Sequence, residues 1–369
     1  MKGALMRQYT VAVAGASGYA GSEMIRLLAA HPAFQVCTVT GHGSAGRLLG
    51  EFSPNLPESL ASLRIQDTKP EILAGHDLVV LALPHGASGP LAEQLDPQSL
   101  MVDLGADHRL EDPENWQDYY GGSFSSPWTY GMPELLNPGG SRQRQLLGQT
   151  RRIAGPGCNV TAVTLAFQPA LAAGLVQTDD LVADLAVGYS GAGRSSGRMD
   201  LLAAQAINSA HPYSVGGTHR HIPEILQNLR KAAAADPNLG GLGKQPIRLG
   251  LTPILVPMSR GILAVVSAKL SERGRGMGMA DIRAVWEQTY AGEQFIDLLP
   301  EGRLPSTADV YGSNRAQVQV AVDQRADRLY AFAAIDNLTR GTAGQALQAV
   351  NLALGLPEET GLTTIGVAP

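Results

Sequence analysis

The chain has 369 residues, a length that allows two domains of ordinary size, and its 44% hydrophobic and 17% charged residues exclude a disordered or fibrous protein. The net charge is −5 and no basic block is present, so we expect no nucleic-acid partner and no binding to an anionic membrane. No run approaches the roughly 18–20 apolar residues of a membrane span, and the first residues lack the apolar core of a signal peptide. With two cysteines in unrelated contexts, these features predict a cytoplasmic enzyme that acts on a small molecule.

The first 155 residues alternate short apolar runs with helical segments. Strands are expected where β-branched runs end in Gly or Pro, at residues 9–15, 34–41, 77–84, 99–106 and 151–157. Between the first two, residues 22–32 have the periodicity of a helix. This alternation is typical of an α/β fold, so we predict a Rossmann-type, doubly wound parallel sheet with helices on both faces over residues 1–155.

The remaining sequence predicts a second domain over residues 156–340. Residues 111–140 are rich in aromatic residues, Gly and Pro and lack periodicity, so we expect a long surface connection there. The strands of the second domain look longer and more antiparallel, and a helix is expected near the end of the chain. The β-rich stretches are 180–191, 246–270, 316–323 and 328–338, and the helix covers 341–355.

A glycine-rich loop follows the first expected strand and opens the first helix. The backbone N–H groups of such a turn, together with the helix dipole, form a phosphate site, and the GxxGxxG spacing is one residue longer than the usual dinucleotide motif. An ordinary strand-to-helix turn is the alternative. The candidate cofactor contacts are Gly15, Ser17, Gly18, Tyr19, Ala20 and Gly21.

The next strand end indicates which dinucleotide is bound. An NAD site usually has an acidic residue about twenty positions after the glycine motif, and Gly41 stands there instead. Ser44 and Arg47 follow and could accept a 2′-phosphate, so we expect NADP(H), although Arg47 could also be an ordinary surface arginine. The loop Leu83, Pro84 and His85 ends the third strand and is expected to border the cofactor.

Cys158 ends a strand and begins a helical run. At a helix N-terminus the dipole and the backbone N–H groups stabilise a thiolate and an oxyanion, so Cys158 is predicted to be a nucleophile rather than a small buried apolar residue. Cys37 lies inside an apolar strand and is expected to belong to the core.

The segment that contains His219, His221 and Glu224 supplies the base that a cysteine nucleophile needs. Chemistry alone does not choose between the two histidines, and Glu224 is a candidate to orient one imidazole. A metal site is the less favoured alternative because no third ligand lies nearby, so we expect none.

Three arginines, each beside a Gly or a turn, are candidates to bind a phosphate or a carboxylate: Arg109, Arg194 and Arg260. Each could instead be a structural ion-pair partner. A dinucleotide site combined with an activated Cys and a His suggests a thioacyl enzyme that exchanges hydride, either oxidising an aldehyde or reducing an acyl phosphate. A Cys–His hydrolase or acyltransferase would leave the glycine motif unexplained, and a non-catalytic NADP-binding regulator would leave the thiol inert.

Segments over nearly the whole chain resemble the N-acetyl-gamma-glutamyl-phosphate reductase family, notably its actinobacterial members. They include GASGYAGSE, ALPHG, VDLGADHRL, SGAGR, GGTHRHIPE, PMSRGIL and AIDNLTRGTAGQALQAVNLALGLPE. The resemblance implies NADPH-dependent reductive dephosphorylation of N-acetyl-L-glutamyl 5-phosphate in arginine biosynthesis. It also implies a Rossmann domain and an α+β catalytic and dimerisation domain like those of glyceraldehyde-3-phosphate and aspartate-semialdehyde dehydrogenases. The C-terminal segment 341–369 would join the first domain, and the protein would form a homodimer or homotetramer.

The resemblance also assigns residues. Cys158 matches the family nucleophile and His219 the acid/base, while the neighbouring Tyr213 and His221 line the same region. The other matching positions are Ser190 and Gly191 as substrate contacts, and Asn337, Gly341 and Gly344 as cofactor contacts.

Two positions depart from the family pattern. After the cysteine, most members have Tyr-Pro-Thr, whereas this chain has Asn159, Val160 and Thr161. Asn159, a candidate substrate contact, resembles the related reductases that act on carrier-protein-linked aminoadipyl or glutamyl phosphates, which are the alternative function. A His replaces the commoner Phe before Arg109, and the arginine is retained.

Overall fold

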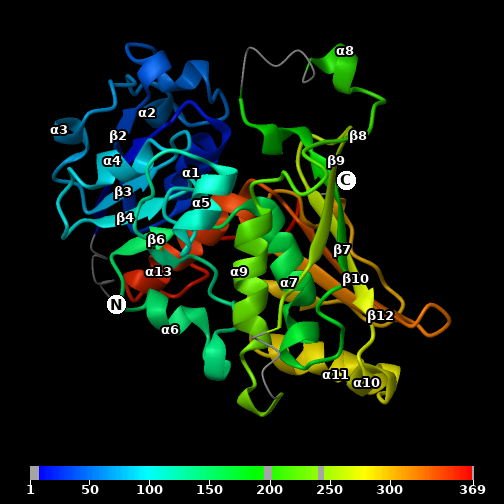
Figure 1. Cartoon of the computed structure of the whole chain (residues 1–369). Helices are drawn as coiled ribbons and strands as arrows, with labels where there is room; N and C mark the ends of the chain where they lie inside the picture. Colours follow the sequence, from blue (N-terminus) through cyan, green and yellow to red (C-terminus); the bar gives the residue numbers. More distant parts are fainter. Residues whose placement is uncertain (1–7, 195–201, 240–244, 368–369) are drawn as a thin grey trace, which may run out of the picture. The chain divides into compact units, whose positions relative to one another are not determined.

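A computed structural model describes residues 8–194, 202–239 and 245–367 (Figure 1). The chain forms two compact units. The first comprises Met1–Gly131, Leu147–Pro156 and Thr342–Leu362, and the second comprises Met132–Leu146, Gly157–Gly341 and Thr363–Pro369. Within the described ranges, no helix is long and apolar enough to cross a membrane.

The first unit contains a six-stranded, fully parallel sheet with the order β2-β1-β3-β4-β6-β5. The strands are β1 (Tyr9–Ala14), β2 (Phe34–Thr40), β3 (Leu78–Leu81), β4 (Leu100–Asp103), β5 (Thr129–Tyr130) and β6 (Arg152–Ala154). The helices are α1 (Tyr19–Ala30), α2 (Glu58–Ala61), α3 (Pro70–Leu73), α4 (Ser88–Ala92), α5 (Pro113–Tyr119) and α13 (Gly344–Ala353). All five strands expected in this half form and start within one residue of the expected position, although β3, β4 and β6 are shorter than expected.

Side chains alternate between two apolar layers along β1. Val11 and Val13 pack in the layer that contains residues of α1 and α13, whereas Ala12 and Ala14 pack in the opposite layer with Leu73 of α3. Because both faces of the sheet are buried, its strands are apolar throughout, as parallel strands usually are. The doubly wound fold expected from the sequence is confirmed.

The expectation that Cys37 lies in the core is wrong, because its side chain is exposed. β2 is an edge strand of the sheet, and along it buried Phe34 and Val36 alternate with exposed Gln35 and Cys37. An edge strand can leave one face in water, which the run of apolar letters did not indicate.

The second unit contains a seven-stranded mixed sheet with the order β11-β12-β13-β10-β7-β9-β8. The strands are β7 (Leu181–Gly188), β8 (His211–Pro212), β9 (Leu249–Val256), β10 (Ile262–Lys269), β11 (Ile296–Leu298), β12 (Ala316–Asp323) and β13 (Arg328–Ile335). The stretch 246–270 forms two strands, β9 and β10, which flank β7 on either side instead of pairing with each other. Antiparallel pairs predominate, and β7–β9 and β11–β12 are parallel.

Helix α7 (Cys158–Ala172) is the central helix of this unit, and it is buried from Asn159 to Leu171. It packs against β10, β12 and β13 and against the helices α9 (Ile222–Ala233) and α11 (Met279–Tyr290). The shorter helices are α6 (Gln143–Leu147), α8 (Ala203–Ala206), α10 (Glu272–Arg275) and α12 (Thr307–Val310).

Residues 111–140 are not a surface connection throughout. They include α5 and β5, and residues 130–137 are all buried. Tertiary hydrogen bonds satisfy their backbone: the Gly131 N–H donates to Ala154 O (2.8 Å), and the Leu136 N–H donates to the Gln168 side chain (3.0 Å). Such partners distant in sequence leave no periodic signal, so the segment could not be recognised as buried.

A buried ion pair joins two distant parts of the second unit. The Arg340 Nη2 lies 2.7 Å from the Glu134 Oε2, and both side chains are fully buried. Removing one partner of such a pair leaves a charge without compensation in the protein interior.

We therefore expect Arg340→Met to lower the free energy of unfolding by about 3–5 kcal/mol. The double variant Glu134→Gln/Arg340→Met should recover much of this loss because it leaves no uncompensated charge. Urea denaturation monitored by circular dichroism measures both. Equal, small losses in the single and double variants would contradict this account of the pair.

Candidate active site

The nucleophile predicted from the sequence is the first residue of α7. Gly157 is the N-cap with extended backbone, and Cys158 opens the helix as a partly exposed thiol that forms no disulfide. Its Sγ lies 4.0 Å from the Asn159 Oδ1. A thiol at this end of a 15-residue helix experiences the positive end of the helix dipole, which favours the thiolate.

The turn before Cys158 is held from α9. The Gly157 N–H donates to the Glu224 Oε1 over 3.0 Å, and the Glu224 side chain is completely buried. A Cβ at Gly157 would lie 2.6 Å from the His221 Nε2, and one at Gly341 would lie 2.7 Å from the Cys158 Cβ. Glycine is therefore required at both positions, and Cys158 has little freedom to move.

His219 has a defined tautomer when it is neutral. The His221 backbone N–H donates to the His219 Nδ1 over 3.0 Å, so Nδ1 must be the acceptor and the ring proton resides on Nε2. Nε2 lies 3.4 Å from the Nδ2 of Asn159, the neighbour of Cys158. Because both nitrogens are donors in this tautomer, they do not hydrogen-bond to each other, and the Nε2 proton remains for another acceptor. Burial, and secondarily the charge of Arg220, lowers the pKa of His219 to about 4.

The other ring side chains lie beside His219. The Tyr213 ring centroid is 5.6 Å from that of His219, and the His221 centroid is 4.9 Å from it. Burial raises the pKa of Tyr213 to about 12, which keeps its hydroxyl protonated as a hydrogen-bond donor. The structure thus brings together Cys158, Asn159, Tyr213, His219 and His221 in one cluster.

The candidate anion-binding arginines lie in three different settings. Arg260 is 16% exposed, and its Nη1 lies 3.2 Å from the Asp336 carboxylate. Arg194 is exposed, just after the short helix Tyr189–Ala192. In the first unit, Arg109 is buried and donates from Nε to Gly155 O (2.7 Å) and from Nη2 to Leu104 O (2.8 Å). Part of its guanidinium therefore links the residues that follow β6 and β4.

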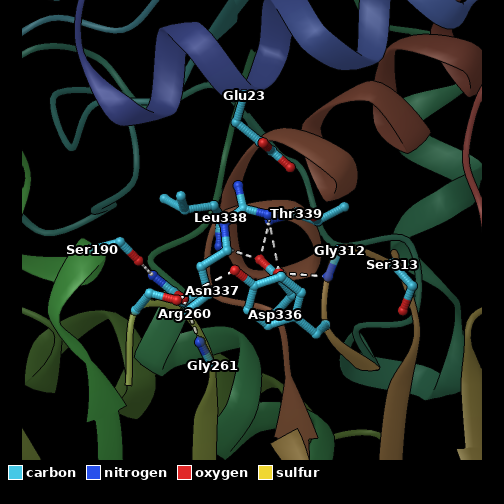
Figure 2. Close-up of polar contacts among 12 residues, drawn as sticks. Glu23, Ser190, Arg260, Gly261, Gly312, Ser313, Asp336, Asn337, Leu338 and Thr339 are labelled. Carbon is cyan, nitrogen blue, oxygen red and sulfur yellow. Dashed lines mark hydrogen bonds and ion pairs between the residues drawn. The ribbon is translucent and has the colours of Figure 1, made fainter. Parts of the chain in front are cut away.

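Ser190 and Asn337 also lie together in the second unit. The Asn337 Nδ2 donates to the Ser190 Oγ (2.9 Å), and the Gly261 N–H donates to the Asn337 Oδ1 (2.7 Å), as Figure 2 shows. Gly191 is exposed beside them, with its Cβ position 3.8 Å from the Asn337 Nδ2.

The glycine loop of the first unit has the geometry of a phosphate cradle. Gly15 has φ +83°, and a Cβ there would lie 2.1 Å from Ala82 O at the end of β3. A Cβ at Gly21 would lie 2.3 Å from Gly15 O. Gly18, the N-cap of α1, has no side chain that could cap the helix, so the N–H groups of the first turn can face a ligand. These residues fit a dinucleotide.

The expected NADP contacts lie on the neighbouring strand end. The buried Ser44 donates from Oγ to the Ser17 Oγ (2.9 Å), and a Cβ at Gly41 would lie 2.5 Å from the Ser44 Oγ. Arg47 is more exposed and pairs with Glu51 at 2.8 Å.

The remaining expected cofactor contacts are placed as follows. Leu83 is half-buried after β3, whereas Pro84 and His85 are exposed, and the His85 ring meets Tyr120 edge-on at 5.2 Å. Gly344 begins α13 and is buried in the first unit.

Sequence reasoning missed several carboxylates that shape these loops. In the first unit, Asp107 accepts hydrogen bonds from the N–H groups of Gly86 (2.7 Å) and Gly89 (3.0 Å), and burial raises the pKa of Asp103 to about 7. In the second unit, Asp336 accepts hydrogen bonds from several donors around Arg260. Asp103 ends β4 and Asp336 directly follows β13, and a carboxylate at the end of an apolar strand could have marked both. No group of three or more His, Cys, Asp or Glu among the described residues could hold a metal ion.

Two family models match the chain. The model described as "Semialdehyde dehydrogenase, NAD binding domain" matches residues 10–139, and "Semialdehyde dehydrogenase, dimerisation domain" matches residues 158–337. A curated relative named N-acetyl-gamma-glutamyl-phosphate reductase, from Bifidobacterium longum (strain DJO10A), is 58% identical and covers 99% of this chain and 100% of its own length.

Solved structures share the fold. Aspartate semialdehyde dehydrogenase II from Vibrio cholerae, complexed with ASA, has a TM-score of 0.66 at 17% identity and covers 95% of this chain and 99% of its own. Aspartate semialdehyde dehydrogenase with NADP from Candida albicans has a TM-score of 0.63 at 16% identity, covering 94% of this chain and 98% of its own.

We expect iodoacetamide at neutral pH to inactivate the enzyme by alkylating Cys158, because the helix N-terminus favours the reactive thiolate. The exposed Cys37 would also react, so the experiment uses Cys37→Ser, which should keep full activity and a stability within about 0.5 kcal/mol of wild type. Peptide mapping relates the label to the loss of activity. Slow labelling of Cys158, or full activity in Cys158→Ser, would contradict its role.

The lowered pKa of His219 predicts a stability change with pH. Because the folded pKa is about 4 and the unfolded value is 6.5, the unfolded chain binds the proton more tightly between these values. Stability from neutral His219 is therefore complete above pH 6.5 and is lost as the pH falls toward 4. We expect the melting temperature of His219→Asn to fall less than that of wild type between pH 7 and 4. His85→Asn, which changes an exposed ring, is the control, and parallel curves for wild type and His219→Asn would refute the shift.

Proposed function

The chain belongs to the N-acetyl-gamma-glutamyl-phosphate reductases of the semialdehyde dehydrogenase family, and from this membership we propose a mechanism in which Cys158 carries the acyl group during NADPH-dependent reduction. The observation that carries the proposal is the placement of Cys158 at the start of buried α7, beside Asn159 and His219. The substrate is N-acetyl-L-glutamyl 5-phosphate, and the product is the 5-semialdehyde used in arginine biosynthesis.

In the first step, the Cys158 thiolate attacks the acyl carbon and the C–O bond to phosphate breaks. Phosphate leaves and a thioester remains on Cys158. NADPH, when bound, supplies the hydride that reduces this thioester. The resulting tetrahedral oxyanion collapses, the C–S bond breaks, and the aldehyde leaves with the thiolate restored.

His219 acts on the oxygen that becomes charged. Its proton resides on Nε2 because Nδ1 accepts from the His221 N–H, so Nε2 can donate to the oxyanion without first taking a proton. The N–H groups at the start of α7 supply a second set of donors. We assign His221 to support, because its Nε2 packs against Gly157 and its backbone fixes the His219 ring.

The proposed substrate contacts are the side chains around this cluster and the arginines that could bind its anionic groups. Tyr213 and Asn159 border His219, Arg260 is partly exposed near Ser190 and Gly191, and Arg194 and Arg109 are further candidates. Glu224 contributes by fixing the Gly157 N–H rather than through exposure to substrate, because its side chain is completely buried.

We infer that the cofactor is NADP(H). The end of β2 carries Gly41 where an NAD site places an acid, and Ser44 and Arg47 are available for a 2′-phosphate once Arg47 releases Glu51. The Candida albicans relative in fold was solved with NADP. The cradle of Gly15, Ser17, Gly18, Tyr19, Ala20 and Gly21, the loop 83–85, and Asn337, Gly341 and Gly344 are the remaining proposed contacts.

We also infer a homodimer or homotetramer built on the sheet of the second unit, whose family model is a dimerisation domain. One face of this sheet keeps Leu263, Val265, Tyr330 and Phe332 only half-buried, although neighbouring positions along β10 and β13 are fully buried. A second copy would cover this apolar face.

We place the enzyme in the cytoplasm, because a thiol nucleophile requires reducing conditions.

The direct test of the function is the reverse reaction. We expect NADPH to form from NADP⁺ and N-acetylglutamate 5-semialdehyde in proportion to added inorganic phosphate, because phosphate must release the acyl group from Cys158. Absorbance at the NADPH band measures it. Turnover that is independent of phosphate would indicate an ordinary aldehyde dehydrogenase, and no turnover at all would exclude this substrate.

The cofactor assignment has its own test. We expect the double variant Gly41→Asp/Ser44→Ala to shift kcat/KM toward NADH, because the new carboxylate repels a 2′-phosphate. Ser44→Ala is included because the Ser44 Oγ would lie only 2.5 Å from the Cβ of the new side chain at position 41. Ser44→Ala alone is the matched control. Wild-type enzyme that uses NADH as well as NADPH would refute the inference.

A further inference from the structure

Asp336 follows β13 and is a fully buried carboxylate at the centre of a polar cluster (Figure 2). Its Oδ1 accepts from the backbone N–H groups of Leu338 (2.9 Å) and Thr339 (2.8 Å). Its Oδ2 accepts from the Gly312 N–H (2.8 Å) and the Arg260 Nη1 (3.2 Å). Both oxygens are therefore used, and Arg260 is the donor among these four that lies on a flexible, charged side chain.

Arg260 is fixed on its backbone side as well. A Cβ at Gly188 would lie 2.9–3.0 Å from the Arg260 backbone, so the two segments are in close contact. The next residue, Gly261, donates its N–H to the Asn337 Oδ1 (2.7 Å). Consecutive residues, Asp336 and Asn337, thus fix the side chain and the following peptide of one arginine.

The loop that begins with Asp336 also contacts Cys158. The Gly341 N–H donates to Asp336 O (2.9 Å), and the Gly341 α-carbon is so close to Cys158 that a Cβ on it would lie 2.7 Å from the Cys158 Cβ. The loop 336–341 is therefore in contact with Cys158 at one end and with Arg260 at the other.

We propose that Asp336 is a positioning residue that orients the Arg260 guanidinium as an anchor for an anionic group of the acyl-phosphate substrate. The inference rests on the proposed function, in which Arg260 contacts substrate. An arginine binds a carboxylate or phosphate through a planar fork of donors, so its orientation determines whether two bonds or one can form. Asp336 binds the Arg260 Nη1. A rigid carboxylate, rather than solvent, therefore sets the orientation of the Arg260 side chain, which is 16% exposed.

A purely structural role of Asp336 would affect stability and kcat rather than the KM for substrate. If Asp336 only satisfied the N–H groups of the loop, its loss would lower stability and kcat through the backbone behind Cys158, without a specific effect on substrate affinity. The KM for substrate and the coupling to Arg260 distinguish the two roles.

The test is a double-mutant cycle of Asp336→Asn and Arg260→Gln, assayed in both directions. In Asp336→Asn the amide oxygen can still accept from Leu338 and Thr339, whereas its NH₂ group faces the donors of Arg260 and Gly312. We expect each single variant to raise the KM for the acyl phosphate by about 10- to 100-fold, the range for a lost charge-assisted bond, with kcat changed by less than about threefold. The double variant should be no worse than Arg260→Gln alone.

Arg328→Gln is the matched control. It removes an arginine of nearly equal exposure (17%) from an ion pair with Asp180 in the same unit, and it should leave KM unchanged. If Asp336→Asn does not fold, Asp336→Glu keeps the charge but displaces the guanidinium, and it should raise KM in the same cycle by a smaller factor.

The outcomes separate the inference from the function on which it rests. An unchanged KM in Arg260→Gln would remove Arg260 from the proposed substrate contacts, while the chemistry at Cys158 would still be tested by its labelling. Two other outcomes would overturn the positioning role of Asp336 and leave Arg260 as a substrate contact. One is a raised KM in Arg260→Gln with a normal KM in Asp336→Asn, and the other is additive effects on KM in the double variant.

Discussion

The hydrogen bond from the Gly157 N–H to the buried Glu224 carboxylate is the interaction on which the rest of the site depends. Gly157 is the N-cap of α7, whose following residues are packed on all sides, so the helix cannot shift to adjust its first residue. With Gly341 directly behind it, Cys158 is positioned by the core of the unit. A nucleophile held in this way keeps its alignment while the acyl group enters and leaves.

The Glu224 carboxylate and the histidines have separate tasks in this site. Because Glu224 accepts from a backbone N–H, it contributes to fixing the turn that carries Cys158. The His219 ring is oriented instead by the His221 N–H, which fixes the proton on Nε2. Burial keeps that imidazole neutral, so the positive field at the thiol comes from the helix N-terminus. The backbone thus stabilises the thiolate, and the His219 side chain donates a hydrogen bond to the oxyanion.

Much of this arrangement could be predicted from the sequence, because its signals are local. The apolar runs of β1, β3 and β4, the glycine loop before α1 and the position of Cys158 at the start of α7 all depend on neighbouring residues. The exposure of Cys37 depends on the place of β2 at the sheet edge, which is set by strand order and not by composition. The sequence marked Glu224 as a candidate to orient an imidazole, but its partner is the Gly157 N–H, 67 residues away. The Arg260 partner of Asp336 is likewise 76 residues away, so neither partner could be identified before the fold was known.

The acylation of Cys158 is the central claim, and one measurement tests it most directly. Enzyme is mixed with N-acetylglutamate 5-semialdehyde and NADP⁺ without phosphate, quenched in acid, and digested for mass spectrometry. The account predicts one N-acetylglutamyl group per chain on the peptide that contains Cys158, formed together with one equivalent of NADPH. NADPH formation without that adduct, or the adduct on another residue, would contradict it.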